Sequence, residues 1–106
     1  MDAASYYADL TRQYRHYGGE VQGWHYGIWD ADVRTHEQAL LRSNERLLGG
    51  LSIEPGTRVL DVGFGGGGFS VWAAKTTGAD VTGITVCEAH VSLAEERATR
   101  HGVAGK

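Results

Sequence analysis

A run of glycines between Gly63 and Gly68 is the part of this sequence best suited to bind a ligand. Five of its six residues are glycine, and a short apolar segment, residues 58–62, precedes it. Residues without a Cβ let the backbone turn sharply and approach a ligand closely. A helix that begins after such a loop offers backbone N–H groups and a partial positive charge. The loop therefore suits a ligand that carries a carboxylate or a phosphate.

The spacing of these glycines fits two classes of cofactor. Gly63, Gly65 and Gly68 fit the dinucleotide fingerprint, whereas Gly63, Gly65 and Gly67 fit the pattern of loops that bind S-adenosylmethionine (SAM). A glycine-rich turn without a ligand is the third alternative. We disfavour it because glycines are entropically costly to order and destabilise a fold that has no use for them.

Features outside the run favour SAM over a dinucleotide. Asp61 lies two residues before Gly63, where a carboxylate can organise the N–H groups of the loop or a water near the ligand's ammonium group. A dinucleotide site expects an acid for the ribose at the end of the next strand, and that position is Thr85. About fifty residues also precede the first predicted strand, whereas a dinucleotide domain commonly begins with it.

The elements predicted around the loop alternate between strand and helix. We expect strands at 58–62 and 80–85, and helices at 69–75 and 88–101, with Val91, Ala94 and Ala98 facing inward. This order implies a parallel sheet with right-handed crossovers. The expected fold is α/β, the N-terminal part of a doubly wound, Rossmann-like fold, whose sheet is incomplete because two strands cannot cover both faces and both edges.

The sequence before the first strand is predicted to be helical. Tyr7, Leu10, Tyr14 and Tyr17 recur at helical spacing and form a stripe that we interpret as packing, and Gly18-Gly19 ends that helix. Thr35 opens a second helix, with Gln38 completing a capping box, and Gly49-Gly50 ends it. We therefore divide the chain into a helical segment, 1–51, and the first two strand–helix units of the ligand-binding domain, 52–106, and expect a longer protein.

Composition restricts the classes of partner. The chain has 106 residues and a formal net charge of −3, without a basic run, so nucleic acid is not the expected partner. No apolar stretch is long enough to span a bilayer, and no His, Cys and acidic residues show the spacing of metal ligands. The single cysteine, Cys87, excludes an intramolecular disulfide, so we expect a cytoplasmic protein. Composition gives no indication of oligomeric state.

Three segments together resemble the class I SAM-dependent methyltransferases. VLDVGFGGGGFSVWAA, starting at Val59, looks like the first motif of that family, and VTGITVCEAHV, starting at Val81, looks like its second strand and the following turn. HYGIWD, starting at His25, looks like its N-terminal cofactor lid. The likeness is greatest to the branch that contains cyclopropane fatty acid synthases, tocopherol-type methyltransferases and related small-molecule methyltransferases.

The resemblance implies roles for individual residues. Gly63 and Gly65 would pass close to the methionine part of SAM, and Gly67 would complete the turn. Thr85 and Val86 would contact the ribose and the adenine; this branch often has Thr at the former position.

The resemblance also assigns a lid and exposes two departures. His25 and Tyr26 would fold over the cofactor from the N-terminal segment. Phe64 stands where a small residue or Cys is usual, which narrows the loop, and His90 stands where the branch often has Gln. A neutral His can still donate one hydrogen bond to the adenine or ribose.

The implied activity is methyl transfer from SAM to a small-molecule or lipid acceptor. The sequence does not say whether carbon, nitrogen or oxygen is methylated, and catalytic residues of this family would lie beyond Lys106. The alternatives are an NAD(P)-binding Rossmann oxidoreductase fragment and a non-catalytic domain with a relic loop.

Overall fold

The computed structural model describes residues 2–17 and 25–106, with the backbone alone described for 14–17. The glycine pair 18–19 and the side chains of Tyr14 and Tyr17 therefore lie outside the described residues. The elements follow the predicted order, with strand and helix ends that differ from the expected ones by one or two residues. They are α1 (Ala3–Tyr17), α2 (His36–Gly49), β1 (Arg58–Val62), α3 (Gly68–Thr77), β2 (Asp80–Ile84) and α4 (Glu88–Arg100).

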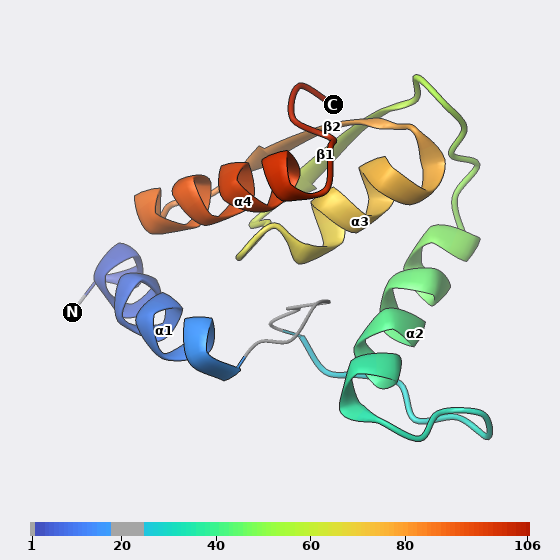
Figure 1. Ribbon diagram of the computed structural model, residues 1–106, viewed down its shortest axis with the longest axis horizontal. Helices are drawn as coiled ribbons and strands as arrows, with labels where there is room; N and C mark the ends of the chain where they lie inside the picture. Colours follow the sequence, from blue (N-terminus) through green and yellow to red (C-terminus); the bar gives the residue numbers. More distant parts are fainter. Residues whose placement is uncertain (1, 18–24) are drawn as a thin grey trace.

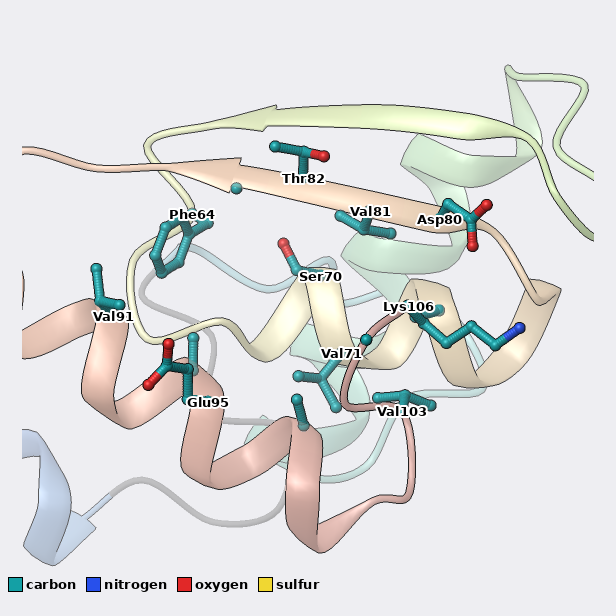
Figure 2. Close-up of a pocket in the computed structure, with 15 residues that line it drawn as sticks. Phe64, Ser70, Val71, Asp80, Val81, Thr82, Val91, Glu95, Val103 and Lys106 are labelled. Atoms are coloured by element: carbon teal, nitrogen blue, oxygen red, sulfur yellow. The ribbon is translucent and has the colours of Figure 1, made fainter.

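The two strands form a parallel pair whose register runs from Arg58 opposite Asp80 to Val62 opposite Ile84. Helices α3 and α4 lie on the same face of this pair (Figures 1 and 2). Within the described chain the opposite face is uncovered, and Leu60 and Val62 there are 61% and 70% exposed. The expected Rossmann-like arrangement is thus present as one layer of helices on a two-stranded sheet.

Helix α4 is buried along a different stripe from the one predicted. Its most buried side chains are His90, Leu93 and Arg97. Val91 is 40% exposed. It lines a cavity of about 490 Å³ between α4 and β2 together with Ala94 and Ala98 (Figure 2). The stripe 91/94/98 does line the cavity next to β2. The contacts of His90 with α1 and of Arg97 with the glycine loop bury the other stripe.

The N-terminal helices flank the sheet layer differently. Helix α1 packs against α4, at the N-terminal end of that helix (Figure 1). Helix α2 begins with the predicted capping box, in which the Thr35 hydroxyl accepts from the Gln38 N–H at 3.1 Å and the Gln38 side chain accepts from the Thr35 N–H at 3.1 Å. Its C-cap is Gly50, as the glycine pair 49–50 predicts.

The segment 25–30 lies along α2. The Ile28 N–H donates to the Ala39 carbonyl at 2.9 Å, and Asp30 accepts from Arg46 at 3.2 Å. A Cβ on Gly27 would lie 2.8 Å from the Ala39 carbonyl carbon, so only glycine allows this approach. The HYGIWD motif is therefore fixed to α2 by its second half. Among the described helices, none is long and apolar enough to cross a membrane.

Candidate cofactor site

The glycine loop follows β1 directly and takes backbone conformations that side chains disfavour. Gly63, Gly65 and Gly67 have φ angles of 73°, 59° and 82°, in the left-handed region that glycine adopts without steric cost. The Gly63 N–H donates to the Ile84 carbonyl at 2.8 Å, and the Gly67 N–H donates to the Phe64 carbonyl at 3.0 Å. The first hydrogen bond therefore joins the start of the loop to the end of β2, and the second closes a turn within the loop, from Phe64 to Gly67.

Two of these glycines, Gly63 and Gly67, meet different surroundings. A Cβ on Gly63 would have no atom within 4 Å, so the space beside it is open to a ligand. A Cβ on Gly67, the N-cap of α3, would lie 3.0 Å from the Cα of Ala94. Gly67 is therefore required for close packing of α4 against the loop, whereas Gly63 leaves room in a cavity.

A cavity of about 430 Å³ brings together most of the residues expected at the adenosine end of the cofactor. It lies at the carboxyl ends of both strands, where open α/β sheets bind ligands. The predicted residues that line it are Gly63, Gly65, Thr85, Val86 and His90, and the remaining lining residues are Tyr7, Val62 and Ile84.

Thr85 and His90 form the polar wall of this cavity of about 430 Å³, which is called the first cavity from here on. The Thr85 hydroxyl accepts from the Cys87 N–H at 3.1 Å at the start of α4, and it lies 3.4 Å from His90 Nδ1. The His90 side chain is 3% exposed, and burial lowers its pKa below the ordinary value near 6.5. The imidazole is therefore neutral at pH 7 and keeps one N–H donor.

Tyr7 is a residue of this cavity that sequence reasoning interpreted as packing. Its ring packs edge-on against His90, with ring centroids 5.7 Å apart, and Tyr6 packs edge-on against Tyr7 at 5.3 Å. Helical spacing alone could not distinguish a packing stripe from a cavity wall, because the partner residue lies on α4, at the far end of the sequence.

A second cavity, of about 590 Å³, lies on the other side of the glycine loop. Gly63 and Gly65 line both cavities, and Asp61 and His25 line only this one. Asp61 accepts a hydrogen bond from the Ser70 hydroxyl at 2.6 Å, which ties the end of β1 to the first turn of α3. His25 Nε2 lies 3.4 Å from the Leu40 carbonyl of α2.

Two of the predicted site residues lie away from both cavities. Tyr26 is 95% exposed, although it follows His25 directly. Gly67 faces α4 as described above. Among the described residues, no three His, Cys, Asp or Glu side chains are grouped as metal ligands would be.

Phe64, the unusual residue of the loop, turns its ring onto β2. A Cβ on Gly83 would lie 2.9 Å from the Phe64 Cγ and 3.0 Å from its Cε1, so the ring occupies the space that a side chain at position 83 would need. Figure 2 shows the ring between β2 and α4. Phe64 lines the second cavity but not the first, so its ring does not narrow the first cavity.

Comparison with known proteins places the chain among enzymes of one family. A family model described as mycolic acid cyclopropane synthetase matches residues 3–106. The 27-O-demethylrifamycin SV methyltransferase of Amycolatopsis mediterranei is 38% identical over 79 residues, covering 74% of this chain and 29% of the relative. The sterol 24-C-methyltransferase ERG6B of Gibberella zeae is 35% identical over 106 residues, covering 94% of this chain and 28% of the relative.

Solved structures give the same fold. The [4+2]-cyclase SpnF superimposes with a TM-score of 0.87 at 27% identity, covering 95% of this chain and 38% of the cyclase. The mycolic acid cyclopropane synthase CmaA1, in complex with SAH and CTAB, gives a TM-score of 0.81 at 22% identity, covering 91% of this chain and 34% of the synthase. The chain therefore spans less than a third of the two curated relatives and under two fifths of these two structures.

Proposed function

Since the chain belongs to the mycolic acid cyclopropane synthetase family, we propose that its protein is a SAM-dependent methyltransferase acting on a small-molecule or lipid acceptor. The observation that supports this proposal most is the first cavity. Its glycine wall is open at Gly63, and a polar wall faces it from Thr85 and His90. An adenosine needs both an apolar slot and a few hydrogen-bonding groups.

The two cavities on either side of Gly63 and Gly65 suggest how SAM lies. We place the adenosine in the first cavity, against Val86 and His90. The methionine part then crosses the two glycines toward the second cavity, where Asp61 lies. The Asp61 carboxylate has one oxygen on Ser70, and it stands where the positively charged ammonium of the cofactor would be favoured.

This placement of SAM suggests a separate role for each of the two segments of the chain. Residues 1–51 serve as a lid segment and residues 52–106 as the cofactor-binding part. His25 already lines the second cavity, whereas the exposed Tyr26 would have to move inward to cover a cofactor. We also propose a cytoplasmic location, which the single buried Cys87 supports, because a segment with one cysteine forms no internal disulfide and suits a reducing compartment.

Bound SAM supplies a methyl carbon already activated by its sulfonium. The residues of this chain hold the donor and exclude water from it, and such positioning accounts for much of the rate of an in-line transfer. The groups that hold the acceptor, and any base that removes its proton, are expected on later strands and loops. The relatives' names include a sterol, a squalene and a geranyl diphosphate methyltransferase, which favours an acceptor with a large hydrocarbon part.

A second candidate is a SAM-fold enzyme that rearranges its substrate without methyl transfer. The likeness to a [4+2]-cyclase at 27% identity favours it. The oxidoreductase alternative is weaker, because Thr85 follows β2 at the position where a dinucleotide site has an acid for the ribose.

Calorimetric titration of the full-length protein with SAM, S-adenosylhomocysteine (SAH) and NAD tests the cofactor. We expect saturable binding of SAM and SAH only; binding of NAD without SAM would refute the proposal. Methyl-labelled SAM then separates the two candidates, since a methyltransferase passes the label to an acceptor from a cell extract and a cyclase does not.

The same titration on Gly65→Val tests the loop. The left-handed φ of 59° and the two added methyl groups are both unfavourable there, so we expect SAH affinity to fall at least about tenfold, or about 1.4 kcal/mol. Gly56→Val is the matched control, because Gly56 has a φ of 84° and lies in the turn before β1, away from both cavities. Equal SAH affinity in the two variants would show that the loop is not the site.

A further inference from the structure

A buried arginine lies directly beneath the glycine loop. Arg97 belongs to the last turn of α4 and is 5% exposed. Its Nη1 donates a hydrogen bond of 2.8 Å to the carbonyl of Gly66, in the middle of the loop. Neither the spacing of the loop glycines nor the predicted face of α4 indicated this contact, because 31 residues separate its two partners.

The fit between the guanidinium and the loop is tight. A Cβ on Gly66 would lie 2.9 Å from Arg97 Nη1 and 3.2 Å from Leu93 Cδ2. The φ of Gly66 is not among the left-handed angles of this chain. Gly66 is therefore required by its neighbours on α4 rather than by its own backbone conformation.

The hydrogen bond from Arg97 restricts the backbone of the glycine loop, a segment with much conformational freedom. Glycine has more accessible backbone conformations than any other residue, so ordering a loop of them around a ligand costs conformational entropy. A charge-assisted hydrogen bond to a carbonyl is stronger than a neutral one, and a guanidinium withdrawn from water requires such a partner. Holding the Gly66 carbonyl fixes the peptide plane between Gly66 and Gly67, in the middle of the loop.

We propose that Arg97 is a positioning residue for the cofactor loop. Its guanidinium holds the Gly66 carbonyl on the buried side and so presets Gly63 and Gly65 for the ligand on the open side. A loop ordered before binding gains affinity because the ligand does not have to order it. This inference rests on the proposed cofactor function and adds a residue that does not line either cavity.

The test compares variants of the full-length protein that differ at Arg97. Arg97→Met keeps the length of the side chain and removes its charge and donors, and Arg97→Lys keeps the charge and one donor group. We expect about tenfold weaker SAH binding and a matching rise in KM for SAM in Arg97→Met, with kcat at saturating SAM within about twofold and partial recovery in Arg97→Lys.

Arg100→Met is the matched control on the same helix. Arg100 is exposed and lies 3.5 Å from Glu96, so its loss should leave SAH affinity unchanged. A purely structural role for Arg97 would lower the melting temperature without changing SAH affinity or KM for SAM. That result, in a folded Arg97→Met protein that binds SAH like the wild type, would overturn the proposal.

Gly66→Ala tests the same contact from the other side, and it serves if Arg97→Met does not fold. The added Cβ displaces the guanidinium, so SAH affinity should fall as in Arg97→Met, and the double variant should lose no more than Arg97→Met alone. Unchanged SAH affinity in Gly66→Ala, or fully additive losses, would contradict the proposal. Failure of the wild type itself to bind SAH would instead refute the cofactor function.

Discussion

At the scale of single residues, His90 can bind and release a proton. The Gln that often stands at this position in the resembled branch of methyltransferases cannot. His90 is almost fully buried between Thr85 and the ring of Tyr7. Burial lowers its pKa, because the low-dielectric surroundings disfavour the imidazolium. In the unfolded chain the same side chain binds a proton near pH 6.5.

The depressed pKa of His90 predicts a loss of stability in mild acid. Between about pH 6.5 and the lower pKa of the folded state, the unfolded chain binds more protons, so the free energy of unfolding falls as the pH falls through this window. Denaturant unfolding of the full-length protein at about pH 7.5 and about pH 5.5 should show that His90→Gln loses less stability than the wild type. His36→Gln, at the exposed start of α2, is the control and should behave as the wild type. Equal pH dependence in all three proteins would contradict the expected titration.

The sequence could group those site residues that follow the ends of the two predicted strands. Gly63, Gly65, Thr85 and Val86 follow strand ends, and parallel strands bring their carboxyl ends together whatever else the chain does. Arg97 and Tyr7 could not be found in this way, because each acts through a contact between distant segments. Arg97 shares the buried stripe of α4 with His90 and Leu93, and that stripe differs from the one that the sequence predicted.

At the scale of elements, the glycine loop is fixed to β2 by the ring of Phe64, which packs against the backbone of Gly83, a residue without a side chain. The ring of Phe64 covers Gly83, and the helical layer below confines it (Figure 2). The strand and helix ranges followed from hydrophobic patterns and turn residues, whereas this packing depends on the pairing register that places Gly83 opposite Asp61. The departure of Phe64 from its family is therefore matched by the glycine beside it.

The pairing of Phe64 with Gly83 predicts that the effect of Gly83→Ala changes sign with residue 64. In the wild-type background the added methyl group meets the ring, and overpacking of this kind costs about 1–3 kcal/mol. In a Phe64→Ala background the same change should be neutral or slightly stabilising, because glycine is a poor strand residue. Thermal unfolding of the four full-length proteins measures this coupling. Additive effects would mean that the ring and position 83 do not compete for space.

At the scale of the whole molecule, the described chain is a sheet covered on one side. Leu60, Val62 and Ile84 are about half to two thirds exposed on the other side. The carbonyl of Lys106 accepts from the N–H of Val81, on the edge of β2 that does not pair with β1. A third strand next to β2 would start at this place, as the order of elements predicts.

A polypeptide of these 106 residues alone is therefore expected to be marginally stable and inactive. Fully burying one aliphatic side chain contributes about 1.5–3 kcal/mol, so the exposure of Leu60, Val62 and Ile84 forfeits roughly 3–5 kcal/mol. That is a large part of the net stability of a domain, about 5–15 kcal/mol. We expect a broad thermal transition in circular dichroism and association in sedimentation, driven by the open sheet face and edge. A sharp melt of a monomer that also transfers methyl groups would contradict this.

The contact between Tyr7 and His90 joins the first helix of the chain to its last, and it has a consequence for synthesis on the ribosome. Helix α1 emerges first, but its partner on α4 follows nearly the whole length of the chain later. At elongation rates of about 5–20 residues per second, the ring face of α1 has no partner for on the order of several seconds. During that interval the ring of Tyr7 lacks its contact with His90, so this wall of the first cavity is completed only after α4 has been synthesised.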